Sequence, residues 1–264
     1  MTLFQEYSEQ GFVVVPGVVS QDAIQALFDT TLRVFKRYNP NSALPDSGLS
    51  YDDERFSERL IRFRSESPQQ FGMFYDTMQT SVALFQLTCA RVLVDTAATL
   101  LGDTIHGLSA TGHMTRMDAP NDDRNSLEWH QEAAYYRQNR VPGHGIVVWT
   151  PLHDLTREHG PVIVCPGSHT RGLLDVAGTG KGDYHKSQQY QLPEDVVAQY
   201  EPHQVVANAG DALFFHMSLF HRSGANVSRR IRFVAGARYH RILTDDFVPG
   251  RLVYKPNETA AGIQ

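Results

Sequence analysis

The chain has 264 residues, of which 41% are hydrophobic and 20% charged, and these proportions are ordinary for a globular protein. Its formal net charge is −5 and it contains no run of lysines and arginines, which argues against a nucleic-acid-binding protein. The longest apolar stretches, residues 12–15 and 146–149, are too short to cross a bilayer. No signal peptide is expected, and Cys89 and Cys165 form no disulfide framework, so we expect a cytoplasmic protein.

The first hundred residues predict one short strand followed by helices. Residues 12–15 form the strand, which a Pro-Gly pair ends. Ser20 can cap a helix. The apolar residues that share one face of this helix are Ile24, Leu27, Phe28, Leu32 and Phe35. A loop is expected over residues 39–50, which contain two prolines, and a second, longer helix over about 73–101.

The rest of the chain predicts many short strands. The candidate strands lie near residues 108–117, 146–150, 162–165, 204–206, 212–215 and 231–239. This pattern is typical of a β-sandwich or barrel with helices bracing one face. We therefore predict a single domain over residues 1–264, mostly β with flanking helices, in which a helical part over about 18–102 packs on a β core over about 103–240.

One long polar segment interrupts the predicted strands. Residues 172–201 contain several glycines and are expected to form a lid or a substrate-shaping insertion. Tyr184, His185 and Lys186 in this segment are candidates to close over a bound molecule, although solvated loop residues would have the same composition.

The strongest local feature is the sequence Trp-His-Gln-Glu at residues 129–132. If these residues form a strand, alternate side chains point to one face, so His130 and Glu132 can approach one ion together. A third ligand must come from elsewhere, and His221 is the candidate because it precedes the last strong strand. A His-x-Glu triplet alone often occurs by chance. Two histidines and one carboxylate would leave coordination positions open for cosubstrate and oxygen, as ferrous oxygenases require.

Nearby polar residues strengthen the hypothesis of a metal site. Arg232 follows His221 by eleven residues and could bind the far end of a dicarboxylate whose near end chelates iron. Ser223 could donate a further hydrogen bond to the same carboxylate. Charge does not distinguish Arg232 from Arg229 and Arg230, and any of the three could instead form a surface ion pair.

Several blocks of sequence occur in a fixed order over about residues 7–240. They are residues 9–17 (EQGFVVVPG), 129–132 (WHQE), 148–154 (VWTPLHD), 158–161 (EHGP), 166–169 (PGSH), 209–212 (AGDA), 221–226 (HRSGAN) and Arg232. Each block is weak alone, but the ordered set is specific. In this respect the chain resembles the phytanoyl-CoA dioxygenase family of ferrous, 2-oxoglutarate-dependent oxygenases.

The resemblance implies a double-stranded β-helix core, a cupin-like jelly roll with the iron inside its mouth. It implies that His130, Glu132 and His221 bind the metal. It implies that Arg232, at the family spacing, and Ser223 bind the distal carboxylate of 2-oxoglutarate. The implied cofactors are Fe(II), 2-oxoglutarate and dioxygen. The implied reaction is the hydroxylation or desaturation of a small-molecule substrate, such as a metabolic or natural-product intermediate.

Two further residues are assigned through the resemblance alone. Trp149 matches a family tryptophan on a core strand near the cosubstrate. His113 falls where many members carry a polar residue, often Gln, that points into the pocket. Both are therefore expected to contribute to cosubstrate binding.

One residue departs from the family pattern. Members usually carry Asp where this chain has Glu132, and Glu is one methylene longer, so it must fold back or shift the strand to reach the ion. Related halogenases carry Ala or Gly at this position, where chloride then binds. A carboxylate at residue 132 therefore favours hydroxylation or desaturation over halogenation.

Three other functions compete with this interpretation. A cupin-like isomerase or hydrolase would use a redox-inert metal and consume no 2-oxoglutarate, but Arg232 at the cosubstrate spacing argues against it. A non-enzymatic small-molecule sensor would have no need of open iron positions. A nucleic-acid demethylase of the same superfamily is disfavoured by the net charge.

The sequence does not identify the substrate. Tyr135, Tyr136 and Arg137 directly follow the metal motif and are candidates for the pocket mouth, and Arg116 and Arg140 for contacts with an anionic substrate. Solvated loop residues explain each of them equally well. Desaturation, epimerisation and ring formation need the same ligands as hydroxylation, and the oligomeric state is not encoded in any motif.

Overall fold

The structure is a computed structural model that describes residues 2–122, 126–176, 178 and 189–249. The helices are α1 (Leu3–Gln10), α2 (Gln21–Tyr38), α3 (Glu54–Glu66), α4 (Pro68–Gln79), α5 (Val82–Thr88), α6 (Arg91–Leu101) and α7 (Glu194–Val197). The strands are β1 (Phe12–Val15), β2 (Leu108–Asp118), β3 (Gly145–Pro151), β4 (Ile163–Val164), β5 (His203–Gln204), β6 (Ala212–His216), β7 (His221–Arg222) and β8 (Arg232–Arg241). Tyr184, His185 and Lys186 lie outside the described residues.

Two antiparallel sheets form the centre of the molecule. The larger has the strand order β1-β6-β3-β8-β2, and the smaller has the order β5-β4-β7. Because side chains alternate across a strand, the larger sheet buries two different faces. In β8, Phe233 and Tyr239 belong to the core that includes the helices. Val234 belongs to a second core, which includes Val147 of β3 and Val164 of β4 and therefore lies between the sheets.

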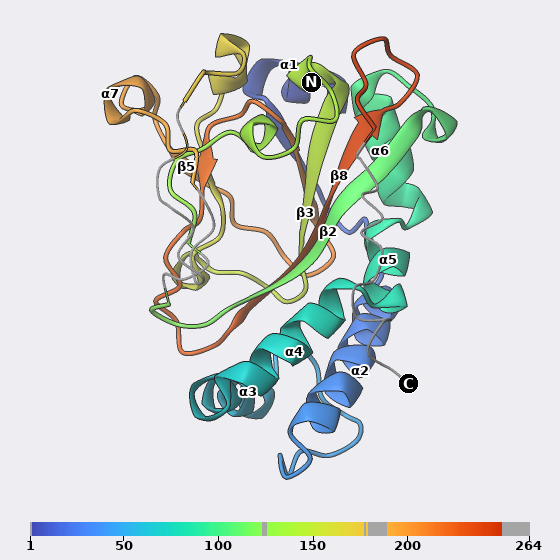
Figure 1. Cartoon of the computed structure of the whole chain (residues 1–264), viewed down its shortest axis with the longest axis vertical. Coiled ribbons are helices and arrows are strands. Elements are labelled where there is room, and N and C mark those ends of the chain that lie inside the picture. The colour runs from blue at the N-terminus through green and yellow to red at the C-terminus, as the bar shows by residue number, and fades with distance from the viewer. Residues whose placement is uncertain (1, 123–125, 177, 179–188, 250–264) are drawn as a thin grey trace, which may run out of the picture.

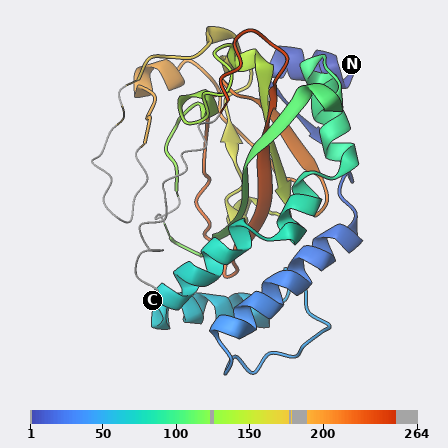
Figure 2. The ribbon, with the colours of Figure 1, turned by 45° about the vertical axis from the view of Figure 1, so that its right-hand side comes forward.

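Helices α2 to α6 lie on one side of the larger sheet, as the two views of the ribbon show (Figures 1 and 2). The longest, α2, begins where the Ser20 hydroxyl accepts a hydrogen bond from the N–H of Ala23, as the sequence predicts. Its buried face contains Ile24, Leu27, Phe28, Leu32 and Phe35, the five residues expected there. The helices thus seal one face of the sheet and leave the other face for a site.

The helical half differs from the sequence prediction in two places. The sequence predicts one helix over about 73–101, but the chain forms α4, α5 and α6 instead. The break before α5 has a local cause, because the Ser81 hydroxyl accepts a hydrogen bond from the N–H of Leu84 and so starts a new helix. Gly102 ends α6 in the left-handed conformation. The sequence pattern did not reveal α3.

The strands follow the prediction more closely. The predicted strands are present as β1 to β6 and β8, with small shifts at their ends, whereas the two-residue strand β7 was not predicted. The expectation of a mostly β protein is not confirmed, because the helices contain more residues than the strands. Antiparallel sheets braced by helices are confirmed, and the jelly-roll winding stays a prediction.

In the described part of the chain, no single helix is long and apolar enough to cross a membrane. Helices α5 and α6 pass that test of length and composition only as a pair, bent by 45° at their junction. Both helices contact β8 of the larger sheet, so their apolar residues are used in the protein core.

Phe35 lies at the centre of the helical core, fully buried, with its ring centroid 5.6 Å from that of Phe56, 5.5 Å from Phe63 and 6.0 Å from Phe74. We expect Phe35→Ala to lower the free energy of unfolding by about 3–5 kcal/mol, because it removes a buried ring and leaves a cavity. Urea denaturation followed by circular dichroism measures this loss. Phe4→Ala, at a position that is 53% exposed, is the control and should cost less than about 0.5 kcal/mol. Similar losses in both variants would contradict this account of the core.

Candidate active site

Backbone pairing brings the two candidate histidine ligands together. His130 and His221 form an isolated antiparallel bridge in which each N–H donates to the other's carbonyl oxygen, over 3.0 and 3.1 Å. Residues directly opposite in such a pair project their side chains to the same side. The two imidazole centroids are accordingly 4.1 Å apart. His221 belongs to β7, so the smaller sheet carries this half of the site.

Glu132 completes the cluster from a turn rather than from a strand. His130 pairs as a strand residue would, but Glu132 begins a 3₁₀ turn over Glu132–Ala134. The carboxylate nevertheless reaches both histidines, with Oε2 3.2 Å from Nε2 of His221 and 3.8 Å from Nε2 of His130. All three residues are buried, and one ligand atom from each lies within 4.8 Å of the others. The structure therefore brings together the three residues that the sequence singled out.

Each imidazole presents its Nε2 atom to the centre of the cluster. Nδ1 of His130 lies 2.6 Å from the carbonyl oxygen of Glu128, and Nδ1 of His221 lies 2.9 Å from that of Leu219. A carbonyl only accepts hydrogen bonds, so Nδ1 carries a proton in both rings, and Nε2 is the atom directed at the cluster. Burial, together with the neighbouring His221, lowers the pKa of His130 to about 3, so its imidazole is neutral at pH 7. Two imidazole nitrogens and a carboxylate oxygen form a donor set that suits Fe(II).

Glu132 is charged although it is buried. Burial alone would raise the pKa of its carboxyl group, but Arg238 and the two histidines outweigh burial and hold that pKa below its ordinary value. Nε of Arg238 donates to Oε1 of Glu132 over 2.7 Å, and a terminal nitrogen of the same guanidinium lies 2.5 Å from Oε1. The cluster therefore has a buried cationic partner on the side away from the histidines.

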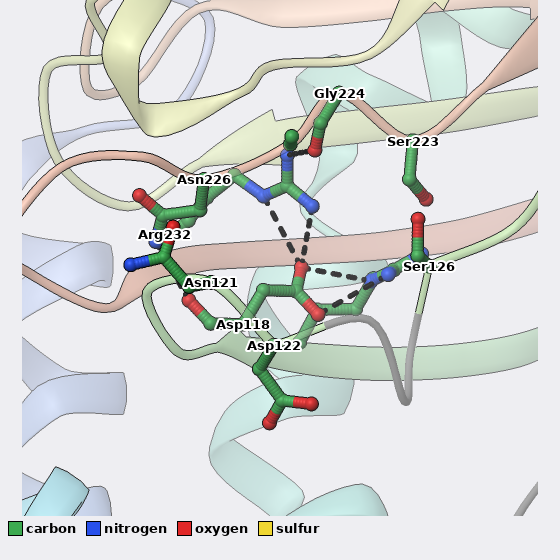
Figure 3. A pocket seen from close by; sticks show the side chains of 10 residues that line it. Asp118, Asn121, Asp122, Ser126, Ser223, Gly224, Asn226 and Arg232 are labelled. Atoms are coloured by element: carbon green, nitrogen blue, oxygen red, sulfur yellow. Dashed lines mark hydrogen bonds and ion pairs between the residues drawn. The ribbon is translucent and has the colours of Figure 1, made fainter.

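A second group of buried charges surrounds Asp118 on β2. Arg232 donates from two nitrogens to Oδ2 of Asp118, over 3.1 and 2.8 Å, and Figure 3 shows the guanidinium facing this carboxylate. Arg116 donates to both carboxylate oxygens over 3.1 Å. Burial opposes the charge on Asp118, but the two arginines hold its pKa below the ordinary value. Two guanidinium groups thus share the Asp118 carboxylate.

A cavity joins the histidine cluster to Arg232. Its lining includes the three ligand candidates together with Ser223 and Arg232, and Trp149 forms part of its wall. The Ser223 hydroxyl accepts a hydrogen bond from the N–H of Leu127, which fixes its position. A bound molecule in this cavity would have the ligand cluster at one end and a buried guanidinium at the other.

A second cavity, of about 260 Å³, reaches the same cluster from another side. Both His130 and Glu132 contribute to its lining, which also includes three aromatic rings and two arginines: Tyr75, Tyr135, Tyr136, Arg116 and Arg238. The two cavities share the cluster, so one could hold a cosubstrate while the other holds a substrate.

Comparison with known proteins agrees with this geometry. Residues 7–234 match the family model described as "Phytanoyl-CoA dioxygenase (PhyH)". The chain belongs to the phytanoyl-CoA dioxygenase family. Members of this family are enzymes that use Fe(II), 2-oxoglutarate and dioxygen, so the class and the cofactors expected from the sequence are confirmed.

Curated relatives align with 63–88% of the length of this phytanoyl-CoA dioxygenase family member. L-proline trans-4-hydroxylase of Streptomyces griseoviridis is 26% identical over 63% of this chain and 68% of its own length. The peroxisomal phytanoyl-CoA dioxygenase of Rattus norvegicus is 24% identical over 88% of this chain and 66% of its own. Ectoine dioxygenase of Streptomyces avermitilis is 23% identical over 85% of this chain and 72% of its own. The chain thus spans about two thirds of the length of these relatives.

Solved structures share the fold of this family member. The epimerase SnoN, in complex with Fe3+, alpha ketoglutarate and nogalamycin RO, has a TM-score of 0.62 at 19% identity, covering 90% of this chain and 82% of that one. EvdO2 from Micromonospora carbonacea var. aurantiaca, complexed with 2-oxoglutarate, has a TM-score of 0.58 at 18% identity, covering 95% of this chain and 91% of that one. At these identities the likeness concerns the fold.

One residue assigned through the family resemblance does not lie at the site. A β-bulge interrupts β2 between Thr111 and Met114, and beyond it Met114 and Arg116 face the cavities. Because neighbouring side chains alternate, His113 faces the helices. Its Nδ1 lies 2.8 Å from the hydroxyl of Thr88, and its ring contacts Phe85 with centroids 4.8 Å apart. The expectation that His113 points into the pocket is therefore wrong.

The arginines that the sequence offered as ligand or substrate contacts lie in different parts of the structure. Arg230 donates to the backbone carbonyl of Asp52 over 3.0 Å, at the protein surface, whereas Arg232 is buried in the cavity wall. Arg137 and Arg140 line a separate cavity rather than the one beside the cluster. Arg116 is the substrate-contact candidate that does border the cluster.

Two buried site residues were not identified from the sequence. Arg238 is six residues after Arg232 on the same strand, so strand alternation places both on one face. Asp118 is likewise two residues after Arg116 on β2. The spacing was thus readable, but which face of each strand meets the cluster depends on the packing of the two sheets.

Proposed function

We propose that this enzyme hydroxylates a C–H bond of a small molecule, with iron held by His130, Glu132 and His221 and 2-oxoglutarate held by Arg232 and Ser223. The observation that carries the proposal is the cavity that joins the N,N,O donor cluster to a buried guanidinium. A dicarboxylate with a metal-chelating end fits these two recognition elements.

The side chains of the site have distinct tasks. When bound, iron and 2-oxoglutarate supply the oxidation of a C–H bond by dioxygen, and the protein positions them. The backbone carbonyls of Glu128 and Leu219 orient the two histidines by accepting their Nδ1–H groups. Ser223, already fixed by the N–H of Leu127, keeps its own O–H to donate to the distal carboxylate.

Asp118 orients the arginine that we propose binds the distal carboxylate of 2-oxoglutarate. Arg232 is only 4% exposed and already pairs with Asp118, so its orientation is fixed before a ligand arrives. Arg116 also donates to Asp118, and the Arg232 guanidinium lines the cavity, where it can bind the distal carboxylate. Asp118 thus acts as a positioning residue for Arg232.

Apolar side chains form part of the wall of the cavity that joins the cluster to Arg232. Val147, Phe215 and Trp149 belong to the core between the sheets and also line the cavity that joins the cluster to Arg232. A wall of this kind excludes water and holds bound groups in one orientation.

The aromatic cavity is our proposed substrate site. It is lined by Tyr75, Tyr135 and Tyr136, and its volume of about 260 Å³ suits a compact molecule. The names of two curated relatives refer to proline and ectoine, both small ring compounds. We therefore propose a small cyclic metabolite as the substrate class.

The proposal is tested by adding Fe(II) and 2-oxoglutarate anaerobically to the purified protein. We expect the weak visible charge-transfer band of an iron–keto-acid complex, and succinate release when oxygen and a substrate are added. Proline, ectoine and an acyl-CoA form a first substrate panel. Zn(II) in place of Fe(II) is the control and should give neither the band nor succinate. A protein that binds Fe(II) but gives no band with 2-oxoglutarate would contradict the proposal.

A further inference from the structure

Arg238 contacts the metal-ligand cluster from a position that neither motif nor family match identified. It lies on β8, is 5% exposed, and directs Nε and a terminal nitrogen to Oε1 of Glu132, over 2.7 and 2.5 Å. Its other terminal nitrogen donates to the carbonyl oxygen of Gly112 over 2.8 Å, and its guanidinium carbon lies 4.5 Å from the ring centre of Tyr136. The guanidinium is thus held on three sides.

These contacts divide the two oxygens of Glu132 between two tasks. Oε1 is bound by Arg238, whereas Oε2 faces Nε2 of His221 and Nε2 of His130. A carboxylate held in this way offers one oxygen to an ion, so it would bind as a monodentate ligand.

The contact with Arg238 restrains the longer side chain of Glu132. Glu has one more rotatable bond than the Asp usual in this family, and ordering that bond costs conformational entropy each time a metal binds. Anchoring Oε1 to a rigid arginine orders the side chain before the metal arrives. The anchor is rigid because β8 pairs with β2 and β3 on either side, opposite Thr111 and Val147.

We propose that Arg238 is a positioning residue that makes Glu132 a usable single-oxygen metal ligand in this chain, an inference that rests on the proposed function. Gly112 helps to hold Arg238 in this position. Its φ is +57°, and a Cβ built there would lie 2.7 Å from an atom of the Tyr136 ring that packs against Arg238. A side chain at residue 112 would therefore displace the ring from the guanidinium.

Metal affinity measures the proposal without relying on catalysis. Anaerobic calorimetry with Fe(II), repeated with Co(II), gives the dissociation constant of wild type and of Arg238→Met, which keeps the length of the side chain and removes its charge and donors. We expect about 10- to 100-fold weaker binding, the usual effect of losing a residue that orients a metal ligand. Arg238→Lys, which keeps the charge but loses the two-nitrogen contact, should fall between the two.

A matched control lies three residues further along the same strand. Nε of Arg241 donates to Asp103 over 2.9 Å, so Arg241→Met also breaks an arginine–carboxylate pair but touches no candidate ligand. Arg241→Met should bind Fe(II) with wild-type affinity. Thermal unfolding of each variant without metal checks that the variant is folded. If Arg238→Met and Arg238→Lys both bind the metals as tightly as Arg241→Met, the proposal is wrong. If these two variants then differ from the wild type only in a raised KM for the substrate, Arg238 is a substrate contact instead.

A double-mutant cycle separates positioning from a general loss of charge. Glu132→Asp shortens the ligand, so its carboxylate cannot reach the metal and Arg238 as Glu132 does. In that background we expect Arg238→Met to weaken Co(II) binding by less than about threefold, which would reveal coupling between the two positions. Equal effects in both backgrounds would overturn the inference. If wild type itself bound neither metal, the proposed function would fail first, and the two failures are thereby distinguished.

Discussion

Replacing His221 with alanine is expected to abolish Fe(II) binding under conditions in which the wild type is saturated. His221 supplies one of only two imidazole donors in the cluster, and its Nε2 lies 3.2 Å from the carboxylate oxygen of Glu132. Changes around a metal ligand already cost about 10–100-fold in affinity, so loss of the ligand itself should cost more than about 100-fold. Succinate release and the charge-transfer band should disappear with the iron.

The control for this experiment is His216→Ala. His216 is a half-buried histidine five residues before His221, at the end of β6, and its Nδ1 accepts a hydrogen bond from the N–H of Ser218. It contributes no atom to the cluster found among the described residues. We expect this variant to bind Fe(II) as the wild type does. A His221→Ala protein that kept both its iron and its charge-transfer band would remove His221 from the metal site.

The three candidate ligands could be predicted from the sequence because they lie in recognisable motifs. His130 and Glu132 are two positions apart, and His221 precedes the strong strand pattern that became β8. The reason for their proximity was only partly foreseen. Glu132 lies on a 3₁₀ turn, so convergence comes from the backbone bridge between His130 and His221 and from the contact with Arg238, rather than from strand alternation. That bridge joins residues far apart in sequence, which no local pattern specifies.

Two non-local features of the fold explain why the pocket assignment of His113 was wrong and why Asp118 was not identified. A bulge inserts an irregularity between Thr111 and Met114, and one such step exchanges the faces on which later residues of β2 lie. Sequence alternation cannot reveal which residue the bulge displaces. Asp118 then joins two arginines from different strands, a combination that becomes visible only once the strand order is known.

The helices show the same division between local and non-local information. The buried face of α2 was predictable because its apolar residues repeat at helical spacing. The breaks within residues 73–101 were not, because the apolar pattern continues across them while the cap at Ser81 starts a new helix. Capping chemistry thus overrode the hydrophobic pattern at that point.

Arg232→Ala is expected to weaken 2-oxoglutarate binding strongly while Fe(II) binding persists. The guanidinium is 4% exposed and lines the cavity that leads to the ligand cluster, but it does not contact His130, Glu132 or His221 in the structure. Hydrogen bonds between charged groups contribute about 1.5–3 kcal/mol each, so losing a two-point contact should raise the dissociation constant by about 100-fold or more. Anaerobic titration of the charge-transfer band at fixed Fe(II) measures that constant directly.

Two companion variants show whether the effect comes from the lost contact or from disturbed packing. Arg232→Ala removes one of the two arginines that donate to the buried Asp118 carboxylate and leaves Arg116, so some loss of stability is expected. Arg232→Lys keeps a positive charge near Asp118 but not the planar fork, and should bind 2-oxoglutarate with intermediate affinity. Arg230→Ala removes a half-exposed arginine that pairs with Asp52 at the surface, and should bind like wild type. If Arg230→Ala weakened binding as much as Arg232→Ala, the charge of the segment rather than the buried guanidinium would account for 2-oxoglutarate affinity, and the cavity would lose its role as the cosubstrate site.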